Sequence, residues 1–541
     1  MKFPPLSEQR LGHIIQKIPR FFSNKVAVPL REVQSESENN AMMAAASEVR
    51  QQRQSLRNFG WIGKLTPCYG ISGNNVAVIA DPKDFYNKLK EEAQNAKKRI
   101  CLASLYLGTG KLEKEMVECL REAVNKSSDP DFKLTVLLDY TRGSRGAFSS
   151  RSMFLPMMRE FGDDRVQLAL YHTPNLRGFW KNVLPDRFNE TIGVSHLKVY
   201  LFDDNLILSG ANLSDSYFTN RQDRYVLIKD CPQLADFFHG LVDTVSSMSF
   251  RVLPDNSEVM FDPTMPHPYT EADGGENFKS EAQKRILDYV ASKIPQKSID
   301  FREQLTIKSV SELAAAEQTV DDDDSGETSG IDTWVYPLIQ MGPLGIKDDE
   351  IVTRVLMSSA SAESRLYLAS GYFNLTSDYM NVILNNSKAK YDIIMASPQV
   401  NGFYGAKGLS GAIPDAYTYI AKNFYERVCS LGQTTRVELY EYYRDKWTFH
   451  VKGLWYYLPG QTLPTLTLIG SPNFGYRSVY RDLEAQIALV TCNKQLQLQL
   501  KQEHVKMQNR SLRVDNKTFE KPERYIPVWV TYVTDYIKTF F

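Results

Sequence analysis

The feature that most constrains this chain is an internal duplication. The strand-like stretch 100–107 (ICLASLYL) has a counterpart at 366–373 (LYLASGYF), and a helix-like stretch follows each of them. The next apolar runs, 134–138 and 391–395, come in the same order. Self-similarity of this kind indicates a supersecondary unit that is built twice, so we expect two halves with the same fold.

Polar motifs follow the apolar repeat in both halves. Each half contains a histidine, a lysine two positions later, an asparagine and then a carboxylate: His196, Lys198, Asn212 and Asp223 in the first half, and His450, Lys452, Asn473 and Glu484 in the second. The asparagine and the carboxylate are 11 positions apart in both halves. The histidine and the asparagine are 16 positions apart in the first half and 23 in the second, a difference that an insertion around residues 459–464 absorbs.

Length and charge limit the class of protein. At about 150 residues per domain, 541 residues exceed one ordinary domain. Hydrophobic residues make up 43% and charged residues 24%, which is typical of a globular protein and excludes a wholly disordered or fibrous chain. Lys plus Arg and Asp plus Glu both number 64, so no excess positive charge attracts nucleic acid or an anionic membrane to the whole molecule. Any affinity for phosphate must be local.

Cysteine usage and hydropathy indicate a chain without disulfides or a membrane span. The six cysteines are scattered with no Cys-x-x-Cys pair, which argues against a disulfide framework or a zinc knuckle and favours a reducing compartment. Residues 453–476 form an uncharged window that is long enough to span a membrane. Pro459, Gly460 and Pro464 interrupt this window, so we predict two strands joined by a loop.

Composition divides the chain into four segments: a presequence and tether at 1–60, a first domain at 61–304, an acidic linker at 305–331 and a second domain at 332–541. The first 34 residues carry six basic and two acidic side chains with apolar residues at near-helical spacing, which favours a mitochondrial presequence over a frayed basic terminus. The four adjacent carboxylates at 321–324 repel one another, so we interpret them as solvated linker, with a calcium site as the alternative.

The paired motifs fit phosphodiester chemistry. Alternate residues of a strand share a face, so the histidine and lysine of each motif point the same way. If the halves pack about a pseudo-two-fold axis, two lysines and two asparagines hold the phosphate oxygens, and no metal or other cofactor is expected. One imidazole can then attack phosphorus while the other protonates the departing oxygen. Asp223 and Glu484 are candidates to orient the imidazoles by accepting a ring N–H.

These residues resemble the signature of the phospholipase D superfamily, His-x-Lys-x-x-x-x-Asp followed by a Gly/Ser-x-x-Asn segment. The first copy matches fully with His196, Lys198 and Asp203, whereas Tyr457 takes the place of the aspartate in the second. The resemblance implies two α/β/α sandwich domains of this type with the active site at their interface. It also implies that the aspartate supports the hairpin that carries the motif. It further implies a phosphohistidine intermediate on His196, with His450 as the acid.

Longer strings resemble the eukaryotic mitochondrial phosphatidylglycerophosphate synthases and extend from about residue 98 to 490: SLYLGTG, LDYTRGSRG, RFNETIG, HLKVYLFDDN, SGANLSDSYFTNRQDRY, GYFNLT, ASPQVNGFYGAKG, AIPDAY, WTFHVKGLW and GSPNFGYRSVYRDLEAQ. This resemblance implies transfer of a phosphatidyl group from CDP-diacylglycerol to glycerol 3-phosphate, with release of CMP. It further implies a mitochondrial location, at the matrix face of the inner membrane, and no nucleic-acid partner.

Other phosphate-binding candidates lie in loops near the motifs. Four basic residues share this position: Arg142, Arg145, Lys407 and Arg477, each with an ordinary solvated side chain as the alternative. The run Gly108-Thr109-Gly110-Lys111 resembles a nucleotide phosphate loop only superficially. Leu105 replaces its first glycine and Leu112 its Ser or Thr, so a glycine turn before a helix at 112–124 is the better interpretation.

Two questions stay open at this level. The aromatic segment 525–541 is suited to a bilayer surface or to packing as a terminal helix on the second domain, and peripheral membrane contact is expected in either case. The alternatives to a transferase are a phosphodiesterase of phospholipase D type that uses water, or a non-catalytic lipid-binding module. The balanced charge argues against a nuclease, and the intact His, Lys and Asn of both halves argue against a decayed site.

Overall fold

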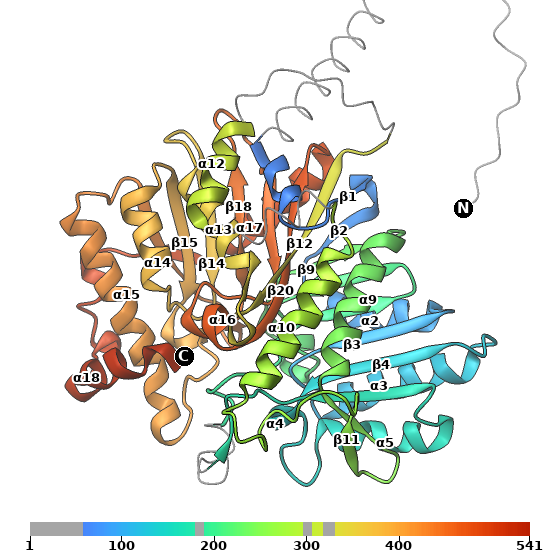
Figure 1. Cartoon of the computed structure of the whole chain (residues 1–541). Coiled ribbons are helices and arrows are strands. Elements are labelled where there is room, and N and C mark those ends of the chain that lie inside the picture. Colours follow the sequence, from blue (N-terminus) through green and yellow to red (C-terminus); the bar gives the residue numbers. More distant parts are fainter. Residues whose placement is uncertain (1–57, 179–188, 296–305, 318–329, 541) are drawn as a thin grey trace, which may run out of the picture. The chain divides into compact units, whose positions relative to one another are not determined.

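The computed structural model describes residues 58–178, 189–295, 306–317 and 330–540. All of them belong to one compact unit, 52–541. The predicted presequence and the four adjacent aspartates lie outside the described residues. Two large mixed sheets dominate the described part (Figure 1).

The first sheet has nine strands in the order β11-β10-β5-β4-β3-β6-β7-β9-β2. Its strands are β2 (Val76–Ile79), β3 (Arg99–Ala103), β4 (Lys133–Asp139), β5 (Val166–Tyr171), β6 (Val199–Phe202), β7 (Asn205–Ser209), β9 (Tyr225–Ile228), β10 (Phe250–Val252) and β11 (Glu258–Met260). The hairpin of β6 and β7 turns at Asp203 and Asp204.

The second sheet has the order β1-β12-β20-β19-β18-β14-β15-β16-β21, with β13 (Ile346–Lys347) paired to β12. Its strands are β1 (Tyr69–Ile71), β12 (Thr333–Met341), β14 (Arg365–Ser370), β15 (Lys390–Ala396), β16 (Val437–Tyr442), β18 (Lys452–Tyr457), β19 (Leu466–Gly470), β20 (Leu483–Thr491) and β21 (Ser511–Arg513). The uncharged window is the antiparallel pair β18 and β19, so the prediction of two strands is confirmed.

The two sheets share one topology. The order β2-β9-β7-β6-β3-β4-β5-β10 in the first corresponds to β12-β20-β19-β18-β14-β15-β16-β21 in the second. In each, the strands β3-β4-β5 or β14-β15-β16 are parallel and the other pairs are antiparallel. The expected α/β fold is confirmed, and the repeated apolar runs occupy corresponding strands. A two-fold axis between the halves stays a prediction.

Helices cover the sheets because their apolar residues recur every three or four positions. The outer face of the first sheet packs against α2 (Pro82–Asn95), α3 (Lys111–Lys126) and α5 (Ser150–Phe161). The outer face of the second packs against α13 (Asp348–Ser358), α14 (Ser377–Asn381) and α15 (Ile413–Ser430). A third core contains residues of both sheets together with α9 (Pro232–Ser247), α10 (Glu276–Ala291) and α17 (Lys494–Gln508). Among the described residues, no helix is both long enough and apolar enough to cross a bilayer.

Two segments pack on the second half, although the sequence analysis assigns one to the first domain and the other to the linker. β1 pairs with β12 of the second sheet, and the turn η1 (Gly60–Lys64) before it joins the second-half core. The start of the predicted acidic linker is a helix, α12 (Ile307–Glu317), which buries Val310 and Ala314 in the same core. The domain boundaries themselves stay a prediction.

Candidate active site

The backbone of each histidine motif is held by the other half of the chain. The short strands β8 (Arg221–Gln222) and β17 (Thr448–Phe449) pair in parallel, and the His450 N–H donates to the Gln222 carbonyl at 2.9 Å. The His196 N–H donates to the Leu483 carbonyl at 2.8 Å. Each histidine is therefore fixed one residue away from the carboxylate-bearing position of the opposite half.

The imidazole rings also contact the opposite half of the chain. Nδ1 of His196 lies 2.9 Å from the Glu484 carboxylate, and Nδ1 of His450 lies 2.7 Å from the Asp223 carboxylate. A carboxylate that accepts the Nδ1–H fixes the tautomer in which Nε2 carries the lone pair. The side chain of His196 is 13% exposed and that of His450 is 5% exposed. The sequence predicts contacts between carboxylates and imidazoles, and the structure assigns each carboxylate to the histidine of the other half.

The lysines and asparagines line the same place. The Lys198 ammonium donates to the His196 carbonyl at 2.8 Å and the Lys452 ammonium to the His450 carbonyl at 2.6 Å, and both lysines are buried. The amide of Asn212 donates to the Tyr217 hydroxyl at 3.1 Å. Among the described residues, the buried amide oxygens of Asn212 and of its counterpart Asn473 have no hydrogen-bond partner, so each keeps a free acceptor.

Burial and mutual repulsion weaken the positive charge of the site. Burial, aided by Lys198 and Lys452 and opposed by Glu484, lowers the pKa of His196 to about 4. Burial and then Lys452, whose ammonium lies 2.6 Å from Nδ1, hold the pKa of His450 well below its usual value, and His196 lowers it further. Burial also lowers the pKa of Lys452 to about 8. Both imidazoles are therefore neutral at pH 7, and an anionic ligand would relieve the repulsion.

Known proteins identify the family. No family model matches the chain. It is 50% identical over 498 residues to the mitochondrial CDP-diacylglycerol–glycerol-3-phosphate 3-phosphatidyltransferase of Gallus gallus, covering 90% of this chain and 87% of the relative. The enzyme of that name from Homo sapiens is 50% identical over 492 residues, with the same coverage. The chain belongs to this phosphatidyltransferase family.

A solved structure of low sequence identity supports the fold. The crystal structure of phosphatidylserine synthase from Haemophilus influenzae Rd KW20 superimposes with a TM-score of 0.63 at 19% identity, over 91% of this chain and 99% of that one. The similarity shows that the phosphatidyltransferase chain and that synthase share an architecture.

Asp203 and Tyr457 explain the asymmetry of the two motifs in this phosphatidyltransferase. Asp203 has φ 53° at the β6–β7 turn, and its carboxylate accepts the backbone N–H groups of Lys97, Lys98 and Arg99 at 2.7–3.0 Å. These contacts lie at the far end of β6 from His196. Tyr457 ends β18, and its hydroxyl lies 2.5 Å from Nε2 of His504 on α17. Both positions therefore anchor the hairpin end, by different chemistry.

The four basic loop residues differ in their partners. Arg145 forms an ion pair with Glu190 at 2.5 Å, and Arg477 forms one with Asp482 at 3.1 Å. The Arg142 guanidinium lies 4.0 Å from the ring centre of Tyr106 and has no carboxylate partner among the described residues. The fourth, Lys407, is exposed before η6 (Gly408–Ala412). Of the three arginines, Arg142 alone forms no ion pair with a described carboxylate.

The loop at Gly108, Thr109 and Gly110 holds a carboxylate where a nucleotide phosphate would lie. The Glu113 carboxylate fills the space beside Gly108 and accepts the Asp215 N–H at 2.6 Å. Glu113 is buried, and a buried carboxylate repels phosphate. The loop leads directly into α3, as the alternative interpretation predicts.

Two aspartates that the sequence analysis did not select hold the segment before His196. Asp139, at the end of β4, accepts the Ser195 N–H at 3.0 Å and caps α4 (Tyr140–Gly143) through the Arg142 N–H at 2.9 Å. Asp482 accepts the Val194 N–H at 3.0 Å. Burial raises the pKa of Asp139 to about 7. The signal for Asp139 was its place at the carboxyl end of a predicted strand.

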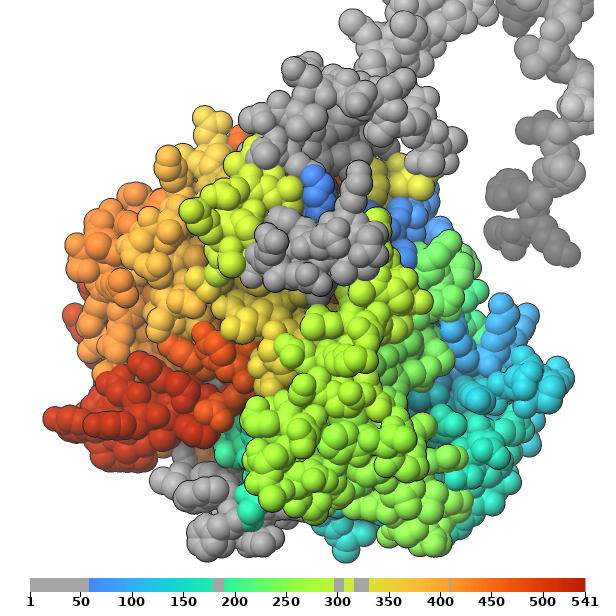
Figure 2. Space-filling view, viewed as in Figure 1, coloured from blue at the N-terminus to red at the C-terminus, as the bar shows by residue number. Residues whose placement is uncertain are grey.

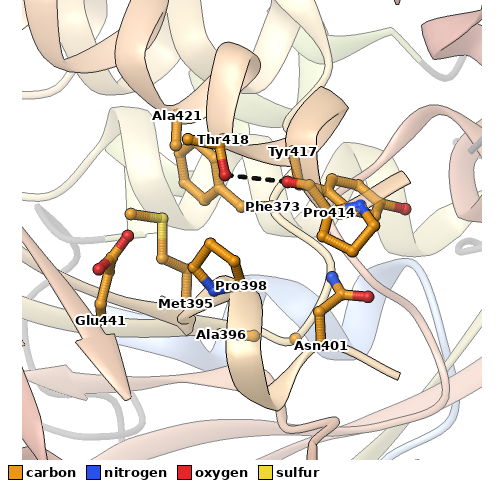
Figure 3. Close-up of a pocket in the computed structure, with 11 residues that line it drawn as sticks. Phe373, Met395, Ala396, Pro398, Asn401, Pro414, Tyr417, Thr418, Ala421 and Glu441 are labelled. Atoms are coloured by element: carbon orange, nitrogen blue, oxygen red, sulfur yellow. Dashed lines mark hydrogen bonds between the residues drawn. The ribbon is translucent and has the colours of Figure 1, made fainter. Parts of the chain in front are cut away.

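A narrow hollow lies between α15 and the carboxyl end of β15 (Figure 3). Gly371 at its wall lies so near that a Cβ there would be 2.7 Å from Cα of His450. Met395, Tyr417 and Glu441 line it further, and its free space suffices for about one water molecule. The hollow as it stands is too small for a nucleotide or an acyl chain.

Proposed function

We propose that the protein transfers the phosphatidyl group of CDP-diacylglycerol to glycerol 3-phosphate, releasing CMP and forming phosphatidylglycerophosphate. The observation that carries the proposal is 50% identity with mitochondrial enzymes of this name over 90% of the chain. The chemistry of the site agrees, because its two lysines and two asparagines suit the oxygens of a phosphodiester.

In the first step of the proposed mechanism, Nε2 of His196 forms a bond to the phosphatidyl phosphorus. The bond from phosphorus to the CMP oxygen breaks, and His450 donates a proton to that oxygen. His196 suits the nucleophile because it is neutral at pH 7 and is the more exposed of the two rings. The pyrophosphate brings negative charge beside Lys452, which favours protonated His450 in the complex.

In the second step, His450 accepts the proton of the glycerol 3-phosphate hydroxyl. The hydroxyl oxygen bonds to phosphorus, the bond to His196 breaks, and Nε2 of His196 regains its lone pair. Glu484 and Asp223 keep the Nδ1–H of each ring in place through both steps. Lys198 and Lys452 stabilise the charge that builds on the phosphate oxygens in both transition states.

The protein is proposed to be mitochondrial, as its relatives are named, and to act at the matrix face of the inner membrane. Peripheral membrane contact is proposed through α18 (Val528–Ile537), which lies in the red C-terminal part that projects at the lower left of Figure 2. Val530 and Thr534 of this helix are buried, whereas Tyr532 is 70% and Tyr536 is 83% exposed. Exposed aromatic residues of this kind prefer the bilayer interface.

The activity is tested with labelled CDP-diacylglycerol in mixed micelles, with and without glycerol 3-phosphate. Continuous release of CMP together with phosphatidylglycerophosphate only when the acceptor is present supports the transferase, and without acceptor at most one CMP per enzyme molecule is expected. Phosphatidic acid as the product in both samples would identify a hydrolase that uses water. Binding of the lipid without release of CMP would identify the non-catalytic module instead.

A further inference from the structure

Arg221 lies beside His450 in an unusual setting for an arginine. Its Nε donates to the Thr448 hydroxyl at 3.0 Å and its Nη1 to the Tyr217 hydroxyl at 2.9 Å. The guanidinium carbon lies 4.5 Å from the centre of the Tyr217 ring. Arg221 stands on β8, the strand that pairs the two halves next to the His450 backbone. Its position is therefore fixed by both halves of the chain.

The charge of Arg221 has no counter-ion in the described part of the chain. Among the described residues, no carboxylate lies within ion-pair distance of the Arg221 guanidinium. No described residue accepts a hydrogen bond from its Nη2. Arg145 and Arg477 are each neutralised by a carboxylate at 2.5 and 3.1 Å. Burial opposes the charge of Arg221, but Tyr217 and Tyr372 raise its pKa overall, so it stays a cation. A partly buried cation without a partner is costly unless a ligand supplies the anion.

The distance to the reacting group identifies which anion fits. The Tyr217 hydroxyl lies 3.4 Å from Nε2 of His450 and 2.9 Å from Nη1 of Arg221. Since Nδ1–H of His450 donates to Asp223, the Tyr217 hydroxyl donates to Nε2 and accepts from Arg221. Arg221 is thus about two hydrogen bonds from the nitrogen that deprotonates the acceptor. In glycerol 3-phosphate, a chain of three carbons separates the attacking hydroxyl from the phosphate, which is a similar span.

We propose that Arg221 binds the phosphate of the acceptor, glycerol 3-phosphate, while His450 takes the proton of its hydroxyl. The inference rests on the proposed function and adds a specificity site to it. A guanidinium binds a phosphate dianion through paired N–H donors, and Nη2 makes no hydrogen bond to a described residue. A water molecule has no group for Arg221 to hold, so this contact favours transfer over hydrolysis.

The test compares the wild type with Arg221→Gln in mixed micelles. The variant is expected to lower kcat/KM for glycerol 3-phosphate by about 10- to 100-fold, mainly through KM, because one charge-assisted contact is lost. The KM for CDP-diacylglycerol and the exchange of labelled CMP into CDP-diacylglycerol without acceptor are expected to change less than about threefold. The exchange also uses His450, so it controls for damage to the acid–base group.

The CMP phosphate is the other source of this chemistry, and the same data separate the two. An equal loss of exchange and of transfer would mean that Arg221 serves the donor or positions His450, and would overturn the proposal. Unchanged kinetics with glycerol 3-phosphate would overturn it as well. Failure of the wild type to form phosphatidylglycerophosphate would refute the proposed function itself, before Arg221 is considered.

Two further variants guard against misfolding. Arg365→Gln removes another arginine that lies over a tyrosine ring, 5.0 Å from the centre of Tyr367, but at the far end of β14 with Asp392 as its partner. It is expected to match the wild type in all three kinetic readouts. Arg221→Lys keeps the charge and loses the paired donors, so it is expected to fall between wild type and Arg221→Gln in KM for the acceptor.

Discussion

In the proposed mechanism the transfer depends on His196 and His450, and the environments of these two residues are similar but unequal. Each ring donates Nδ1–H to a carboxylate of the other half, yet the Lys452 ammonium contacts the His450 ring directly. His196 therefore keeps a more open Nε2, and His450 needs substrate charge before it can hold a proton. This inequality supports the proposal that His196 is the nucleophile and His450 the acid.

Trapping the intermediate tests the assignment at His196. With CDP-diacylglycerol labelled in the phosphatidyl group and no acceptor, we expect label on the wild-type protein after denaturation at alkaline pH, where a phosphoramidate bond survives. His196→Ala is expected to carry no label and to lose nearly all turnover, because the atom that bonds to phosphorus is missing. Label that persists in His196→Ala would make His450 the nucleophile. His239→Ala, which changes a partly exposed histidine paired with Asp243 on α9, is the control and is expected to label normally.

The charge of Lys452 sets an alkaline limit to activity. Its pKa, lowered to about 8 by burial, means that the ammonium is present at pH 7 and lost as the pH rises through 8. We expect kcat/KM for CDP-diacylglycerol to fall above about pH 8, since the neutral amine no longer stabilises the phosphate oxygens. Lys452→Arg cannot lose its proton, so the part of the fall near pH 8 that Lys452 causes is expected to disappear in this variant. A limb near pH 8 that persists in this variant would assign the titration to another group.

The residues of the site were readable from sequence because their chemistry repeats with fixed spacing. The sequence could not show that Glu484 serves His196 and Asp223 serves His450, since linear order does not tell which strand lies beside which motif. Arg221 escaped selection for the same reason. Its significance comes from the lack of a carboxylate partner among the described residues, and this is a property of the folded environment alone.

At the scale of elements, the β6–β7 hairpin depends on Asp203. Its carboxylate satisfies three backbone N–H groups at the start of β3, and its φ of 53° is rare for residues other than glycine, asparagine and aspartate. Asp203→Ala is expected to destabilise the protein by about 1–3 kcal/mol in urea unfolding. The kcat of the variant is expected to stay within about threefold of the wild-type value, because the contacts lie at the far end of β6 from His196.

Asp203→Asn separates the two roles of this side chain. Asparagine tolerates the same backbone conformation and keeps one acceptor, so we expect less than half of the alanine effect on stability. A large loss of kcat with unchanged stability in either variant would give Asp203 a part in the chemistry instead. The corresponding Tyr457 bonds to His504 and shows that the hairpin end needs an anchor rather than an aspartate.

The strands of the repeat could be predicted because short apolar runs bounded by turn residues are typical of β-strands. The edge elements could not. β1 is three residues long, and its place beside β12 depends on tertiary pairing that no local pattern records. The helix α12 was assigned to the linker because acidic and small residues follow it, although Val310 and Ala314 are four positions apart and face one core.

At the scale of the whole described unit, the halves are joined by more than the site. The buried side chain of Arg224, a first-half residue, extends into the second half. Its guanidinium lies 2.8–3.0 Å from the two carboxylate oxygens of Glu503 and 3.8 Å from the centre of the Trp455 ring. The next residue back is Asp223, which holds His450. The contact that joins the halves therefore also fixes the carboxylate, so a shift between the halves would misplace the general acid.

The C-terminal segment would extend this coupling to a membrane that received the exposed face of α18. The Asn374 amide donates to the Lys538 carbonyl at 2.6 Å, and Arg481 donates to the Thr539 carbonyl at 2.8 Å. Asn374 lies in the loop after β14, and Arg481 directly precedes Asp482. The exposed face of α18 is thus attached to loops of the site, and a bilayer that received this face would lie near the place where the lipid substrate reacts.

A triple variant tests the membrane contact of α18. Trp529→Ser, Tyr532→Ser and Tyr536→Ser together remove aromatic side chains that are 49%, 70% and 83% exposed, while the buried Val530 and Thr534 keep the helix packed on α15. At roughly 1 kcal/mol for each ring that enters the interface, binding to cardiolipin-containing vesicles in a flotation assay is expected to fall about 100-fold. Activity in detergent micelles is expected to persist, because no group of the site is altered. Val259→Ser with Leu287→Ser, two exposed apolar residues of the first half, is the matched control, and an equal loss of flotation in that variant would place the membrane contact elsewhere.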